Sequence, residues 1–250
     1  QNIGAYGAEV AELIASVRAW DRLRNRVVWL ALGELGLAYR DSRLKQSLTD
    51  TEVGGGRLWG PTGRWVVLDA TFAVRQGSLS SRIAYSQLAG ALGVELGERV
   101  PERELREAVL ELRRSKGMVL DGADHDTWSA GSFFTNPILT MEQAEQLPEG
   151  APRFPVTDHS QVVLGTKAAP VIEGLVKTSA AWLIDHAGFS KGFAVEAGAP
   201  AGLSTKHVLA LTNRGGATGA DLARLRDAVV AGVRERYGVT LVPEPVQVGF

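Results

Sequence analysis

The sequence contains no cysteine, has almost no net charge and lacks long apolar runs, and each absence narrows the possible functions. Without cysteine, a disulfide framework, a thiolate metal site and a cysteine nucleophile are excluded. The 27 basic and 28 acidic residues offer no general attraction to nucleic acid or to an anionic membrane. The apolar runs are far shorter than the roughly 18 residues that span a bilayer, and the four histidines show no metal-ligand spacing. We therefore expect no nucleic-acid partner, no membrane insertion and no metal site.

Length and composition indicate a folded, globular protein. With 250 residues, of which 45% are hydrophobic, the chain can bury one large core or two modest ones. The lack of cysteine suits a reducing compartment, and we expect a cytoplasmic monomer.

Strand patterns occur in the first third of the chain. Short apolar runs from Ile14 to Trp20 and from Arg26 to Leu32 predict paired strands, and a β-branched and aromatic run from Trp65 to Val74 predicts a third. Residues 1–7 have no periodicity, and residues 50–64 are rich in glycine without a phosphate-loop pattern. We expect both of these segments to be loops.

Helical patterns dominate the remainder. Apolar residues recur at helical spacing between Pro101 and Gly117, and cations cluster at the end of that segment, where they favour the helix dipole. Thr140 and Gln143 fit a capping box that opens a short helix through Leu147. The further predictions are helices from Lys177 to Ala187 and from Thr218 to Tyr237, strands at Val208 to Thr212, Val239 to Leu241 and Val246 to Val248, and a loop-like segment from Pro148 to Pro170.

The stretch from Ser129 to Pro137, SAGSFFTNP, carries the main chemical signal. In a functional interpretation its glycine allows close approach to a ligand, Ser132 presents a hydroxyl, Asn136 offers an amide and the two phenylalanines anchor the loop. The alternative is a turn followed by a short buried strand, since Gly-Ser and Asn-Pro are ordinary turn dipeptides. A serine without a visible base leaves both interpretations open.

Five segments, found in the same order over the whole chain, give a family resemblance. Together they resemble the UDP-N-acetylenolpyruvoylglucosamine reductase family, flavoenzymes of bacterial peptidoglycan synthesis. The segments are Gln1-Asn2-Ile3-Gly4-Ala5-Tyr6-Gly7, Tyr39-Arg40-Asp41-Ser42, the SAGSFFTNP stretch, Lys177-Thr178-Ser179-Ala180-Ala181-Trp182-Leu183-Ile184-Asp185, and Val242-Pro243-Glu244.

The resemblance implies an α+β fold. Part of a vanillyl-alcohol-oxidase-type FAD-binding domain would be followed by a compact α+β substrate-binding domain. The implied ranges are 1–117 for the FAD-binding part, 118–238 for the substrate-binding domain and 239–250 for a segment that returns to the N-terminal domain. Family members carry a further N-terminal portion with a Gly-rich flavin-diphosphate segment, so we expect such a portion ahead of Gln1.

The chemistry implied by the resemblance needs FAD, NADPH and two kinds of protein group. NADPH reduces FAD, and hydride then passes to C3 of the enolpyruvyl ether, which leaves an enolate to be stabilised and C2 to be protonated. The residues that match the catalytic set of the family are Arg40, Ser132 and Glu244, with Ser132 as the proton donor. Taken alone, Arg40 in YRDS fits an ordinary surface ion pair equally well.

Binding residues are carried over in the same way. Asn2, Ile3, Gly4 and Tyr6 match a flavin-contacting loop, whose alternative is a simple connector. Tyr85, Lys116, Asn136 and His207 match positions that hold the UDP-sugar substrate, although the helix dipole alone accounts for cations near Lys116.

Two functions remain after this reasoning. One is an NADPH-dependent flavoenzyme that reduces UDP-N-acetylenolpyruvoylglucosamine to UDP-N-acetylmuramic acid. The other is an inactive fragment that acts only as a sugar-nucleotide-binding module. SAGSFFTNP and YRDS together disfavour a third possibility, an unrelated flavin oxidase of the same broad fold.

Overall fold

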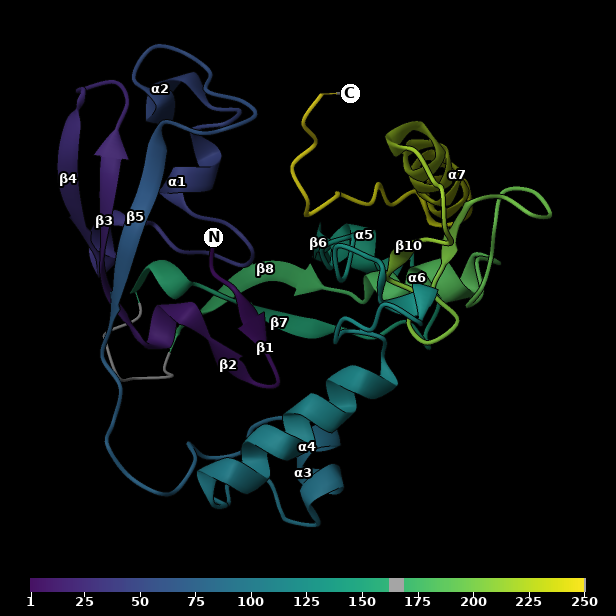
Figure 1. Cartoon of the computed structure of the whole chain (residues 1–250), viewed down its shortest axis with the longest axis horizontal. Coiled ribbons are helices and arrows are strands. Elements are labelled where there is room, and N and C mark those ends of the chain that lie inside the picture. Colours follow the sequence, from purple (N-terminus) through teal and green to yellow (C-terminus); the bar gives the residue numbers. More distant parts are fainter. Residues whose placement is uncertain (162–168, 250) are drawn as a thin grey trace. The chain divides into compact units, whose positions relative to one another are not determined.

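The computed structural model describes residues 1–161 and 169–249. They form two compact units, each of which is described by itself. The first unit holds Gln1–Ala108 and Thr157–Ile172, and the second holds Val109–Val156 and Glu173–Phe250. Both mix helices with antiparallel strand pairs, so the predicted α+β class is confirmed (Figure 1). The predicted domain ranges stay a prediction, because compactness alone assigns no role to a unit.

A three-stranded antiparallel sheet forms the body of the first unit. Strand β3 (Ile14–Asp21) lies between β4 (Arg26–Ala31) and β5 (Trp65–Phe72) (Figure 1). The three predicted strands are confirmed to within two residues at each end. Apolar side chains of β3, including the buried Ile14 and Val17, pack into one core cluster, as expected for a sheet with one covered face.

The remaining elements of the first unit are short. They are β1 (Gly4–Ala5), β2 (Ala8–Glu9), the 3-10 turns Val10–Glu12, Leu32–Glu34 and His159–Gln161, α1 (Arg43–Gln46), α2 (Thr51–Gly54) and α3 (Ser86–Leu92). Two predicted loops were therefore partly wrong. Residues 1–7 contain a strand of a small hairpin, because β1 pairs with β2. Residues 50–64 contain α2, because the Asp50 side chain accepts hydrogen bonds from two backbone amides of its first turn.

Helix α4 (Glu102–Ser115) begins in the first unit and ends in the second. The predicted helix after Pro101 is confirmed. It ends at Ser115, two residues before Gly117, whose φ of 68° lies in the left-handed region that favours glycine.

The second unit contains small sheets and one long helix. Its strands are β6 (Ile138–Thr140), β7 (Phe154–Thr157), β8 (Val171–Lys177), β9 (Ala201–Leu203) and β10 (Leu211–Asn213). Its helices are α5 (Met141–Glu145), α6 (Ala180–His186), α7 (Gly219–Tyr237) and the 3-10 turn His125–Thr127. The sheet order is β6-β8-β7, and β9 pairs with β10.

Helix α7 organises the core of the second unit. The predicted helix is confirmed, and its Leu225, Val229 and Val233 are fully buried and pack with α6 residues in one cluster. Burying each of these side chains stabilises the fold by roughly 1.5–3 kcal/mol. Both ends of the helix follow the expected chemistry: Thr218 and Asp221 form a capping box, and Gly238 ends the helix with a φ of 68°.

Two predictions between Pro148 and Ala187 need correction. The loop-like segment from Pro148 to Pro170 contains β7, while residues 162–168 lie outside the described part. A proline within β7 misled the prediction, and it is tolerated because β7 is an edge strand. The predicted helix from Lys177 begins only at Ala180, since Lys177 ends β8 and Ser179 caps the helix through the Trp182 amide.

The predicted strands near the C-terminus are also wrong. Val239 to Leu241 and Val246 to Val248 form no strand in the described residues; instead Pro243 makes an isolated antiparallel bridge with Phe134. The strand expected at Val208 to Thr212 is shifted to β10. The capping box at Thr140 is confirmed, although α5 ends at Glu145 rather than Leu147. Within residues 1–161 and 169–249, no helix is both long and apolar enough to cross a bilayer.

Candidate active site

The SAGSFFTNP loop is firmly anchored in the second unit. Phe134 is 2% exposed, and its ring lies 5.3 Å from that of Phe133 at a steep angle, which confirms the anchoring role expected for the two phenylalanines. The Phe133 amide donates to the Leu209 carbonyl at 2.8 Å. Gly131 has a φ of 80° and open space around its missing Cβ, so it serves the turn through its conformation rather than through close approach.

Glu244 lies beside this loop through backbone pairing. The Glu244 amide donates to the Phe133 carbonyl at 2.8 Å, and the Thr135 amide donates to the Val242 carbonyl at 3.0 Å. The structure therefore joins the Ser132 and Glu244 segments, although 112 positions separate them in the sequence.

His207 contacts Ser132. Its Nε2 lies 3.3 Å from the Ser132 Oγ. A turn positions the ring, because the buried Ser204 hydroxyl accepts hydrogen bonds from the Lys206 and His207 amides. Burial, followed by the positive charges of Lys116 and Lys191, lowers the pKa of His207 to about 4. At neutral pH the imidazole is therefore neutral.

Asp126 is hydrogen-bonded to the turn that carries His207, and its backbone packs against the turn that follows Lys116. The Asp126 carboxylate accepts hydrogen bonds from the Thr205 amide, at 2.9 Å, and from the Thr205 hydroxyl, and it pairs with Arg214 at 2.9 Å. A Cβ at Gly117 would lie 2.9 Å from the Asp126 carbonyl oxygen, so the turn after Lys116 packs directly against the same segment. Burial lowers the pKa of Lys116. Sequence reasoning missed Asp126, because no motif distinguishes it from a surface carboxylate.

Asn136 links the loop to helix α6. Its Oδ1 accepts a hydrogen bond from the Ala180 amide at 3.0 Å, and the Pro137 carbonyl accepts one from the Thr178 amide. The amide group of Asn136 therefore helps to satisfy the first turn of α6, which gives this residue a structural role beside its predicted contact with substrate.

Arg40 is held in the first unit by the predicted flavin loop. Its Nη1 donates to the Asn2 carbonyl at 3.1 Å, and its Nη2 donates to the Gly4 carbonyl at 2.6 Å. The φ of Arg40 is 52°, a left-handed conformation that is uncommon for a residue other than glycine. Lys45 donates from Nζ to the Arg40 carbonyl at 3.0 Å. These contacts fix the guanidinium against the loop backbone.

Asn2 and Glu9 order the predicted flavin loop, residues 1–7. Asn2 is fully buried; its Nδ2 donates to the Glu9 carboxylate at 2.6 Å, and its Oδ1 accepts from the Ala11 amide. A Cβ at Gly4 would lie 2.8 Å from the Glu9 Cγ and 3.1 Å from the Arg40 Nη1. Only glycine fits between these two side chains without displacing one of them.

The two predicted ligand-facing tyrosines meet in the first unit. The Tyr6 and Tyr85 rings lie 5.7 Å apart at 90°, an edge-to-face arrangement. Tyr85 is 38% exposed, and Ile3 on the same loop is 62% exposed. The structure thus groups Asn2, Ile3, Gly4, Tyr6, Arg40 and Tyr85 in the first unit and Lys116, Ser132, Asn136, His207 and Glu244 in the second. The convergence of Arg40 with Ser132 and Glu244 stays a prediction.

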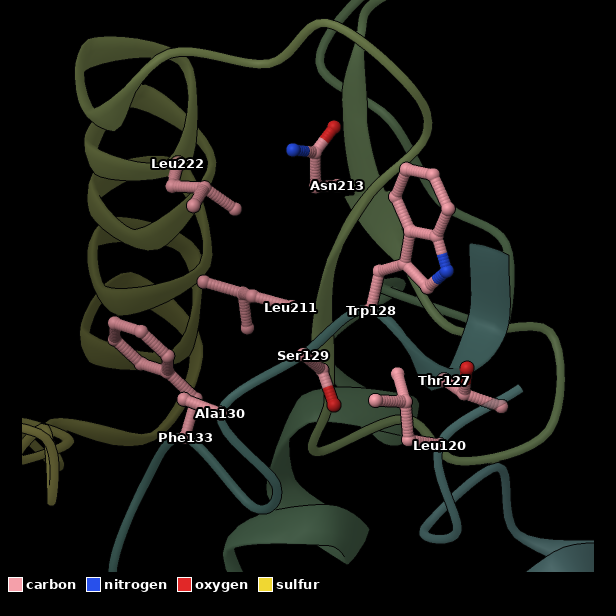
Figure 2. Close-up of a pocket in the computed structure, with 9 residues that line it drawn as sticks. All are labelled: Leu120, Thr127, Trp128, Ser129, Ala130, Phe133, Leu211, Asn213 and Leu222. Atoms are coloured by element: carbon pink, nitrogen blue, oxygen red, sulfur yellow. The ribbon is translucent and has the colours of Figure 1, made fainter. Parts of the chain in front are cut away.

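A pocket of about 470 Å³ opens next to the SAGSFFTNP loop. Figure 2 shows Leu222 reaching toward it from α7 and Trp128 on the opposite side. Its lining residues are Leu120, Thr127, Trp128, Ser129, Ala130, Phe133, Leu211, Asn213 and Leu222. None of them carries a charge, so this pocket does not suit a diphosphate. Among the described residues, no group of three histidines and carboxylates is placed to hold a metal ion.

A comparison with known families decides the classification. Residues 123–248 match the model described as UDP-N-acetylenolpyruvoylglucosamine reductase, C-terminal domain. The chain belongs to the UDP-N-acetylenolpyruvoylglucosamine reductase family. The resemblance expected from the sequence is therefore confirmed.

Relatives that carry the reductase name match the entire chain. The identity is 49% over 249 residues with the reductase of Cutibacterium acnes, 50% over 250 residues with that of Streptomyces coelicolor and 49% over 250 residues with that of Nocardia farcinica. The chain spans 58%, 60% and 59% of these relatives, respectively. A crystal structure of the Thermus caldophilus reductase aligns over 97% of this chain and 56% of its own, at 18% identity and a TM-score of 0.46.

Proposed function

We propose that this chain is part of an NADPH- and FAD-dependent reductase that converts UDP-N-acetylenolpyruvoylglucosamine to UDP-N-acetylmuramic acid in cytoplasmic peptidoglycan synthesis. The observation that supports this function most directly is the joining of the Ser132 and Glu244 segments, with Glu244 N donating to Phe133 O at 2.8 Å. Two segments that carry residues matching the catalytic set are thereby joined although they are distant in the sequence. The names of the relatives agree with this reaction.

The first unit is the part proposed to contact the flavin. The exposed Ile3 side chain and the partly buried Tyr6 ring give the loop an apolar surface against which a flat ring system can pack, which supports a flavin there. When bound and reduced by NADPH, FAD would supply hydride to C3 of the enolpyruvyl group. The loop carbonyls orient Arg40, which would bind the substrate carboxylate, since a guanidinium matches both oxygens of a carboxylate.

The second unit is proposed to donate the proton and to bind the sugar nucleotide. Ser132 would donate its hydroxyl proton to C2. A serine hydroxyl is a weak acid, but the positive charges of Lys116 and Lys191 that act on His207 also favour a developing alkoxide nearby. Glu244 would assist the enolate in its protonated form or through an intervening group. Lys116 would meet the diphosphate charge, and Asn136 would hydrogen-bond the sugar-nucleotide portion.

The test uses the full-length gene product. We expect it to be yellow and to oxidise NADPH only when the enolpyruvyl substrate is supplied. Ser132→Ala should slow reoxidation of the flavin by substrate by about 10²-fold or more, which is typical for loss of a proton donor, and leave reduction by NADPH nearly unchanged. Ser81→Ala, at an exposed serine of the first unit, is the matched control and should behave as wild type. Equal loss of both half-reactions in Ser132→Ala would contradict the proton-donor role.

The alternative is a sugar-nucleotide-binding module without redox activity. It predicts a colourless gene product that binds the substrate but does not oxidise NADPH. The same absorbance measurement separates the two functions. A monomer is proposed with either function, and analytical ultracentrifugation tests it.

A further inference from the structure

The contact between Ser132 and His207 addresses a step that the proposed reaction leaves open. As Ser132 gives its proton to C2, negative charge develops on its oxygen, which must take up another proton. His207 Nε2 lies 3.3 Å from this oxygen, within hydrogen-bonding distance. The ring is only partly buried, whereas Val208 next to it in the sequence is buried.

A neutral imidazole is suited to moving a proton between two sites. One ring nitrogen carries hydrogen while the other accepts one, so a proton can leave Nε2 as another arrives at Nδ1. Burial, followed by the positive charges of Lys116 and Lys191, favours the neutral ring. The turn around Ser204 holds the His207 backbone, and Asp126 holds Thr205 on the same turn.

We propose that His207 is a positioning residue that relays a proton from solvent to Ser132, an inference that rests on the proposed reductase function. As the C2–H bond forms, the Oγ–H bond of Ser132 breaks. In the same step the Oγ takes the proton from Nε2, and Nδ1 takes one from water. The net change is one proton moved from solvent to C2, and no electrons move in these transfers. Exchange with water afterwards returns the starting tautomer.

The alternative is that His207 only supports the local fold. A structural role predicts that variants weaken stability or both half-reactions together, whereas a relay affects only the half-reaction that consumes a proton. The experiment therefore measures, in the full-length holoenzyme, flavin reduction by NADPH and flavin reoxidation by the enolpyruvyl substrate separately. The variants are His207→Gln and His207→Ala, and the matched control is His186→Gln at an exposed histidine on α6.

For a relay we expect His207→Gln to slow reoxidation by about 10²-fold while reduction stays within about twofold of wild type. Added imidazole should restore much of the lost reoxidation rate in His207→Ala. Reoxidation within about twofold of wild type in His207→Gln, equal slowing of both half-reactions, or no rescue by imidazole would each overturn the relay.

A measurement on the wild-type protein covers the case in which the variants do not fold. In mixtures of H₂O and D₂O, a relay moves more than one proton in the reoxidation step, so its rate should depend on the deuterium fraction along a curve. A straight line would overturn the relay. If wild type fails to oxidise NADPH in the presence of substrate, the proposed function itself fails. Normal wild-type turnover with unaffected His207 variants removes only the relay.

Discussion

Replacing Asp126 tests whether this carboxylate organises the turn that carries His207. Asp126 is 5% exposed, and its carboxylate accepts two hydrogen bonds from Thr205 and pairs with Arg214. Asp126→Asn keeps the size and one acceptor but removes the charge. A hydrogen bond to a charged group contributes about 1.5–3 kcal/mol. Because the Arg214 side chain is 28% exposed, we expect a smaller loss of about 1–2 kcal/mol.

Asp126→Ala removes all three contacts and leaves buried donors unpaired, so its loss should approach about 3 kcal/mol, the low end for breaking a buried pair. Urea and thermal unfolding followed by circular dichroism measure both variants. For a domain of this size about 1 kcal/mol corresponds to a shift of roughly 2–4 °C in Tm. Asp227→Asn, at a carboxylate on α7 that is 67% exposed and pairs with Arg226, is the matched control and should not shift Tm. An Asp126→Ala protein as stable as wild type would refute the reasoning.

The same network predicts a dependence on pH. Burial by itself would raise the pKa of Asp126, but the hydrogen bonds from Thr205 and the charge of Arg214 hold it below its ordinary value. A carboxyl group whose pKa is lowered by folding stabilises the protein above its unfolded pKa, and this contribution is lost as pH falls through the folded pKa. The stability difference between wild type and Asp126→Asn should therefore shrink below about pH 4. A difference that stays constant between neutral pH and pH 2 would contradict the lowered pKa.

Two further predictions concern packing and charge elsewhere in the fold. Gly232→Ala in α7 should destabilise the protein by about 1–2 kcal/mol, because a Cβ would overlap the Phe189 ring. Gly90→Ala in α3 is the control; it has open space around it and should be neutral or stabilising. Equal Tm shifts of the two variants would contradict this. Arg64→Leu should lower the free energy of unfolding in urea by about 3–5 kcal/mol, because it leaves the buried Asp21 carboxylate without its bidentate partner. Adding Asp21→Leu should recover part of this loss. A double variant that is less stable than Arg64→Leu alone would contradict this.

The elements that the sequence predicted well are those with strong local signals. Helix α7 combines a continuous apolar stripe with Thr218 at its start and Gly238 at its end, so local chemistry and tertiary packing agree. Strands β3 and β4 likewise follow short apolar runs. Strand β8 was missed because its seven residues lie directly before a helical pattern, and the prediction extended that helix back to Lys177.

The candidate site residues could be proposed only through the family resemblance. SAGSFFTNP and Val242-Pro243-Glu244 point to Ser132 and Glu244 as candidates, but no local pattern shows that their segments pair. The 3.3 Å contact of His207 with Ser132 and the support from Asp126 also arise from the folded chain. Such contacts join residues far apart in sequence, so neither periodicity nor spacing records them.

The pairing of Phe133 and Thr135 with the Val242 to Glu244 segment has a consequence during synthesis. The partner segment leaves the ribosome more than a hundred residues after the serine loop, so the emerging chain carries that loop with its backbone groups unmatched. The pairing cannot form until the later segment has been translated. Premature termination between the two segments would yield a product that contains Ser132 but lacks the backbone segment that pairs with its loop.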